Sequence, residues 1–206
     1  MMCNNTTHEP LELYLPDYTV AETERGDFCE GQTFQTEVQR THWHVNMAAM
    51  LKLGEWFDFM RRNGVWDNTR IIIASDHGKT MDRETEGLGF FDYMIMDDPD
   101  IDVEIVNPLL LVKDFGGLQL RTADDFMTIA DVPFFAMDGI IEKPVNPFTN
   151  RLMDNGAKMS GPQLVTSSHK ASPSKQADRT TFDTSDGHWF SVHDDIFDER
   201  NWGLVE

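Results

Sequence analysis

Lysine and arginine are scarce in this chain. The 206 residues contain 17 Lys and Arg against 36 Asp and Glu, which gives a formal net charge of −19 at pH 7. Binding of nucleic acid or anionic lipid needs basic side chains that neutralise phosphates, so we expect no nucleic-acid partner. An acidic protein acting on an anionic ester would need a local positive centre, and a bound metal ion would supply one.

Long apolar runs are missing and cysteines are few. No uninterrupted apolar run approaches the roughly 18 residues of a membrane-spanning helix, so we expect no membrane span in this chain. The first five residues have neither the basic flank nor the apolar stretch of a signal peptide, so any export is expected to be directed from upstream. Two cysteines, Cys3 and Cys29, form either one bridge in an oxidising compartment or small buried thiols.

The middle of the chain has clear helix and strand patterns. Apolar residues recur at helical spacing from Thr41 to Asn63, with Thr41 as the expected N-cap and Gly64 as the stop signal. Apolar residues dominate Arg70–Ser75 and Pro108–Lys113, which is typical of buried strands. A helix, a turn and a buried strand make half of a βαβ unit, so we expect an α/β fold with a mostly parallel sheet flanked by helices.

The remaining segments are less regular. We predict one or two short helices between Ala123 and Ile141, interrupted at Pro133, and a strand at His188–His193. Residues 154–187 are rich in small and polar residues with little apolar periodicity, which predicts an extended surface loop. The chain has neither an internal repeat nor an obvious linker, so we expect one domain over residues 1–206.

The strongest chemical signal is Ser75-Asp76-His77-Gly78, directly after the first predicted strand. Ligands in open α/β sheets bind beyond the carboxyl ends of the strands, where Asp76 and His77 are expected. A carboxylate and an imidazole are suitable ligands for Zn²⁺ or Mn²⁺. Taken alone, such a pair is more often a strand-terminating Asp beside a surface His.

The context favours the metal interpretation. The stretch from His44 to Gly78 contains Gly54-Glu55-Trp56, Asp67-Asn68-Thr69 and Ser75-Asp76-His77-Gly78 in order. It resembles the sulfatase and phosphoglycerol transferase branch of the alkaline phosphatase superfamily. The resemblance implies an alkaline-phosphatase-like domain, with Asp76 and His77 as ligands of a divalent metal such as Mn, Zn or Ca.

A second segment, Asn4-Asn5-Thr6-Thr7-His8-Glu9-Pro10, is similar to a strand end in lipoteichoic acid synthases and phosphoethanolamine transferases. This resemblance implies that His8 binds substrate beside its phosphate group, whereas the local alternative is a His in an ordinary turn. Residues 107–113 and 129–133 are similar to structural landmarks of the same superfamily.

The superfamily's nucleophile, a Thr, Ser or modified Cys, has no counterpart here. Thr6 and Thr7 lie in a different motif, and Cys3 lacks the expected Pro and Arg neighbours. We therefore expect the carboxyl-terminal part of a sulfatase-like catalytic domain, inactive by itself. The resemblance implies a bacterial, extracytoplasmic or periplasmic parent that is membrane-anchored through an upstream region. Exposed sheet edges would then promote self-association.

Other candidate side chains have simpler explanations. His42 and His44 suit the start of a helix, and the acidic run 97–104 suits a solvated loop better than a Ca²⁺ site. Lys79 is equally suited to contact an anionic substrate or to lie on the surface. Three further histidines are weaker candidates for a further metal ligand: His169, His188 and His193.

Three functions follow from these patterns. The first is a metal-dependent phosphoester transferase or hydrolase acting on an anionic ester, and the second is a sulfuric ester hydrolase. The third, of another class, is a non-catalytic domain that binds a ligand or a partner chain. A Thr nucleophile upstream would support the first, and a Cys or Ser in a Cys-x-Pro-x-Arg frame would support the second.

Overall fold

The computed structural model describes residues 3–8, 13–20, 29, 31–79, 103–153, 161–168, 184–185 and 187–205. The chain divides into two compact units. The described residues of the first unit lie within Met1–Thr69 and Phe115–Gly117. Those of the second unit lie within Arg70–Thr80, Gly87–Asp114 and Leu118–Glu206.

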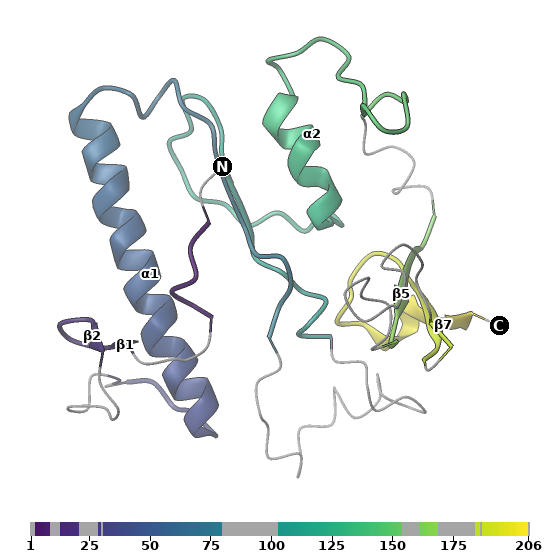
Figure 1. Cartoon of the computed structure of the whole chain (residues 1–206), viewed down its shortest axis with the longest axis horizontal. Helices are drawn as coiled ribbons and strands as arrows, with labels where there is room; N and C mark the ends of the chain where they lie inside the picture. Colours follow the sequence, from purple (N-terminus) through teal and green to yellow (C-terminus); the bar gives the residue numbers. More distant parts are fainter. Residues whose placement is uncertain are drawn as a thin grey trace, which may run out of the picture. The chain divides into compact units, whose positions relative to one another are not determined.

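The first unit is built on one long helix, α1 (Glu37–Arg62) (Figure 1). The helix predicted at this place is confirmed, but its N-cap is Thr36, whose side chain accepts a hydrogen bond from the Gln39 amide at 3.3 Å. The predicted cap, Thr41, is wrong, because its hydroxyl donates back to helix carbonyls. The helix is followed by Gly64, whose φ of 68° suits a residue without a Cβ.

A short hairpin packs on α1. Strands β1 (Leu13–Tyr14) and β2 (Thr19–Val20) pair antiparallel, and β1 contacts the helix. The side chain of His44, on α1, is fully buried, and its ring lies 5.3 Å from that of Tyr14 in β1. His42 is also buried, so the prediction that both histidines cap the helix is wrong. They lie on the helix face that carries the apolar core: Val45, Ala48, Ala49 and Met60.

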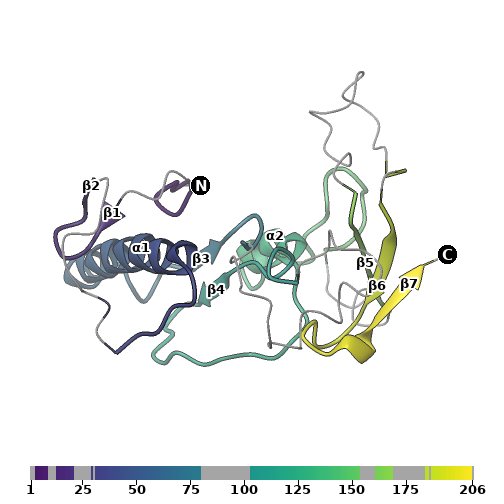
Figure 2. The same cartoon turned by 90° about the horizontal axis from the view of Figure 1, so that it is seen from below.

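The second unit contains an antiparallel strand pair and a short helix. Strand β3 (Ile71–Ala74) pairs with β4 (Leu110–Lys113) from Ile71↔Lys113 to Ala74↔Leu110, and the two run side by side in both views (Figures 1 and 2). Helix α2 (Val132–Met137) follows the 3₁₀ turn η1 (Ile129–Asp131) and contacts β3. Pro133 lies in the first turn of α2, so it opens the helix instead of interrupting one.

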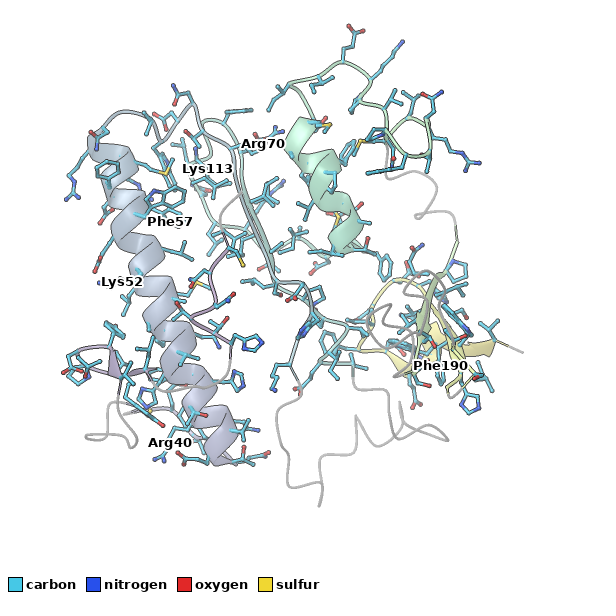
Figure 3. All side chains as sticks on the ribbon, viewed as in Figure 1. Arg40, Lys52, Phe57, Arg70, Lys113 and Phe190 are labelled. Atoms are coloured by element: carbon cyan, nitrogen blue, oxygen red, sulfur yellow. The ribbon has the colours of Figure 1, made fainter. Side chains whose placement is uncertain are left out.

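Arg70, at the start of β3, joins these elements (Figure 3). Its side chain is only 8% exposed, and its guanidinium donates to Asp114 Oδ1 at 2.8 and 2.9 Å. It also donates to the carbonyl of Phe135, at 2.6 Å, and to that of Asp138. A single guanidinium therefore fixes the end of β4 and the carboxyl end of α2 at the start of β3.

A three-stranded antiparallel sheet completes the second unit (Figure 2). Its order is β5 (Gln163–Thr166), β6 (Trp189–Val192) and β7 (Trp202–Val205), and the turn η3 (Glu199–Asn201) precedes β7. The strand predicted at 188–193 is confirmed as β6. Strand β5 lies within residues 154–187, for which an extended loop was predicted.

The predicted fold class is wrong. Every strand pairing among the described residues is antiparallel, so the expected α/β domain with a mostly parallel, alkaline-phosphatase-like sheet is not what this chain forms. The apolar run at residues 71–74 does identify a strand. It does not specify the direction of the partner strand, because continuous apolar runs occur in both kinds of sheet.

Candidate metal site

The predicted ligands Asp76 and His77 lie in the turn that follows β3. The Ser75 amide donates to the Leu109 carbonyl at 3.0 Å, and the Leu109 amide donates to Ser75 Oγ at 2.7 Å. Directly after the pair, the Gly78 amide donates to the Ile105 carbonyl at 2.8 Å. The turn is therefore fixed at both ends to the segment that leads into β4.

The His77 ring has a defined tautomer. Its Nδ1 lies 2.6 Å from the Gly78 carbonyl oxygen, and a carbonyl accepts hydrogen bonds only. Nδ1 therefore carries the proton, and the lone pair of the neutral ring is on Nε2. A backbone carbonyl that holds one ring nitrogen in this way commonly orients the other toward a metal.

The carboxylate of Asp76 faces the same space. Its Oδ1 accepts from the His77 amide at 3.1 Å, while its Oδ2 is 3.9 Å from His77 Nε2. Two ligands that share a tetrahedral Zn²⁺ lie roughly 3.3 Å apart, given bond lengths of about 2.0–2.1 Å. Closing the 3.9 Å separation by about 0.6 Å would bring both atoms to this spacing, so the donor set fits two ligands of a divalent ion.

Both side chains are highly exposed. The His77 side chain is 65% exposed and that of Asp76 is 90% exposed. Charges in this environment are screened by water and salt, so the two residues attract a cation weakly unless further groups join them. Within the described ranges, no group of three or more His, Cys, Asp and Glu side chains is placed to hold one ion.

His8 does not share a unit with the pair. It lies in an exposed turn of the first unit, in which its amide donates to the Asn5 carbonyl at 3.0 Å. Asp76 and His77 belong to the second unit. The structure thus brings two of the three predicted site residues together and gives His8 the local geometry of a turn.

The weaker candidate residues that the structure describes have local contacts or lie on the surface. His193 hydrogen-bonds through Nδ1 to its neighbour Asp194 at 2.8 Å, and the ring of His188 contacts Phe190. Lys79 is exposed. His169 and most of the acidic run 97–104 lie outside the described residues.

Two polar groups in the structure were not anticipated. One is the Ser75 hydroxyl, which bonds the opposite strand. The other is a buried pair in the first unit, in which Cys29 Sγ lies 3.3 Å from His44 Nε2. Neither cysteine is in a disulfide: Cys29 is a buried thiol, as one of the two alternatives predicted, whereas Cys3 is exposed. The helical spacing of His44 with Ala48 was the available signal for its burial, because residues four apart share a face.

Comparisons with protein-family models, with curated proteins and with solved structures find no match to this chain. Among the helices that the structure describes, none has the length and apolar character needed to cross a bilayer.

Proposed function

We propose that this chain supplies two metal ligands, Asp76 and His77, to a metal-dependent phosphoester transferase or hydrolase related to the alkaline phosphatase and sulfatase superfamily. The observation that carries the proposal is the turn after β3, where a carboxylate oxygen and an imidazole lone pair lie 3.9 Å apart. The proposal rests on this site and on the sequence from His44 to Gly78, and not on the fold.

In this proposal each residue has a separate task. His77 presents Nε2 as a neutral ligand because the Gly78 carbonyl holds the proton on Nδ1. Asp76 contributes negative charge through Oδ2, while its Oδ1 is held by the His77 amide. A divalent ion bound there would supply charge stabilisation for the oxygens of a transferred phosphoryl group.

The substrate class follows from charge and from the resemblance. A protein with a formal charge of −19 repels an anionic ester unless a cation lies at the site, so metal binding and ester binding would be coupled. A sulfuric ester is the alternative substrate. Extracytoplasmic placement and self-association through exposed sheet edges belong to the same proposal.

A second candidate is a non-catalytic domain that binds a ligand or a partner chain. The exposure of the pair favours it, since side chains that are 65% and 90% exposed give an ion little shelter from water. A domain of this kind would bind metal weakly or not at all and would use the same surface differently.

Calorimetric titration of the metal-stripped chain with Mn²⁺ and Zn²⁺ separates the two candidates. We expect one binding event in the wild type, weakened at least tenfold in Asp76→Ala and in His77→Ala, because each variant loses one of two protein ligands. His193→Ala is the matched control, since it removes a similarly exposed imidazole beside an aspartate.

Binding that persists in both Asp76→Ala and His77→Ala would contradict the proposed site. The absence of any binding in the wild type would favour the non-catalytic candidate. Equal losses in His77→Ala and His193→Ala would show non-specific attraction of cations to an acidic surface.

A further inference from the structure

The last residue pair of the β3–β4 ladder is joined in part by a hydrogen bond to a side chain. The register pairs Ala74 with Leu110, so Ser75 stands opposite Leu109 as the next pair. In a continued antiparallel ladder these two residues would exchange two bonds between their amides and carbonyls. Only one of them is of that kind, from the Ser75 amide to the Leu109 carbonyl at 3.0 Å.

The hydroxyl of Ser75 accepts the other bond. The Leu109 amide donates to Ser75 Oγ at 2.7 Å, where the main-chain carbonyl of Ser75 would be the usual acceptor. The Leu109 amide is therefore satisfied while the main chain after Ser75 leaves the ladder. Because the backbone leaves at this residue, Asp76 and His77 project from a turn and do not continue the alternating faces of the strand.

The turn is closed at its other end by Gly78. Its amide donates to the Ile105 carbonyl at 2.8 Å, and its own carbonyl accepts from His77 Nδ1 at 2.6 Å. The backbone of Glu104 lies so near that a Cβ on Gly78 would be 1.7 Å from its carbonyl oxygen. The His77 ring is thus oriented by a peptide group whose position depends on both ends of the turn.

We propose that Ser75 is the positioning residue of the Asp76–His77 pair: its hydroxyl ends the β3–β4 ladder and thereby sets the turn that aims both ligands at one point. This inference rests on the proposed metal site, but it also predicts properties of the metal-free chain. The residue acts through the main chain and does not touch the ion.

The test in the metal-free chain uses Ser75→Ala, Ser75→Thr and the control Ser191→Ala. Ser191 also makes a single side-chain bond in a sheet, from its Oγ to the Gly203 carbonyl at 3.2 Å. We expect Ser75→Ala to speed hydrogen exchange of the Leu109 amide by about tenfold, as the loss of one hydrogen bond allows. In the same variant the ring-nitrogen NMR signals of His77 should no longer report a single Nδ1–H tautomer.

The second readout is metal affinity, measured with Zn²⁺ and Mn²⁺. We expect Ser75→Ala to raise the dissociation constant about tenfold, which is the usual effect of removing a group that orients a ligand. Ser75→Thr keeps the hydroxyl and should restore the wild-type tautomer, exchange rate and affinity. Ser191→Ala should leave all three unchanged.

The outcomes are separable. Unchanged Leu109 exchange and an unchanged His77 tautomer in Ser75→Ala would overturn the role of Ser75, whether or not the chain binds metal. A changed tautomer with no metal binding in the wild type would support the positioning role and count against the proposed function. Failure of Ser75→Thr to restore the tautomer would also overturn the inference, because the hydroxyl would then not be the group that acts.

Discussion

The second unit contains two pairs in which an Asp and a His are neighbours in the sequence, Asp76–His77 and His193–Asp194. The two pairs differ in which group holds the imidazole ring. In the pair after β3, His77 Nδ1 is bound by a main-chain carbonyl, and the Asp76 carboxylate is left facing Nε2 at 3.9 Å. In the pair after β6, His193 Nδ1 is bound by the Asp194 carboxylate itself at 2.8 Å. In the first pair, Asp76 Oδ2 and His77 Nε2 face one another, and both can bind a metal ion. In the second pair, the Asp194 carboxylate is already used to hold the His193 ring.

Exposure does not explain this difference. The side chains of His193 and Asp194 are 53% and 82% exposed, close to the values of the first pair. What differs is the partner of Nδ1, and that partner is set by the turn in which the pair lies. Sequence adjacency of Asp and His is therefore insufficient to define a metal site, and the main chain decides which atoms converge.

Among substitutions that alter one Asp and His pair and not the other, we expect Gly78→Ala to have the largest effect. The added Cβ would lie 1.7 Å from the Glu104 carbonyl oxygen, so one of the two backbones must move. We expect a loss of about 3 kcal/mol in the free energy of unfolding and loss of metal binding, with the His193–Asp194 pair unaffected. Denaturant unfolding and NMR of the two histidines would measure both effects.

Gly54→Ala is the control for that substitution. Gly54 lies inside α1, and an added Cβ there would meet no atom within 4 Å. We expect it to stabilise the helix by about 0.5–1 kcal/mol. A loss of stability at Gly54 as large as at Gly78 would mean that the close approach to Glu104 is not the cause.

A smaller effect is expected from Arg70→Met. This change removes the guanidinium bonds to Asp114 and to the two α2 carbonyls, while keeping much of the apolar stem. We expect a loss of about 2 kcal/mol in unfolding free energy, because hydrogen bonds to a charged group are lost. Exchange of the β3 and β4 amides should rise, and exchange in β6 and β7 should not.

Comparable loosening of β3–β4 and β5–β7 in Arg70→Met would contradict this account. It would mean that the guanidinium supports the second unit as a whole and does not act selectively on the elements that lead to the Asp76–His77 turn.

These results mark what the sequence could specify. Helical spacing identified α1, and β-branched runs identified β3, because both signals are local. The direction of the β3 partner was not local, so the predicted parallel sheet was wrong. The burial of His42 and His44 was missed because polar side chains near a helix start favour a capping interpretation, although both share a face with Val45 and Ala48.

For the candidate site too, the sequence predicts the local features and misses those that depend on distant residues. Residue type and position after a strand were enough to select Asp76 and His77. The tautomer of His77 and the hydroxyl of Ser75 that ends the ladder depend on residues 105–109, which lie about thirty positions further along the chain. Pairing over such a distance has no signature in a short motif.

The smallest predicted effect concerns the loop beyond the second pair. The Arg200 side chain and then the Arg200 amide hydrogen-bond Asp198, which lowers the pKa of that carboxyl to about 2. An unfolded chain has an aspartate pKa of about 3.9, so the folded state is favoured above that value and this contribution is lost as the pH falls toward 2.

The matching variant is Asp198→Asn. We expect it to be less stable than the wild type at pH 7 by a small amount, and equally stable only at about pH 1, below the folded-state pKa of about 2, where Asp198 is protonated in both states. Thermal unfolding at the two pH values and a carbon NMR titration of the carboxyl would test this. A stability difference that is constant with pH would contradict it.

Paramagnetic broadening of the amide NMR spectrum by sub-stoichiometric Mn²⁺ tests directly whether Asp76 and His77 hold the ion. Because broadening falls steeply with distance from the ion, one spectrum compares both Asp and His pairs in the same molecule. We expect the signals of Asp76, His77 and Gly78 to disappear first, while those of His193 and Asp194 stay sharp. Broadening centred on His193 and Asp194, or spread evenly over the acidic surface, would contradict it.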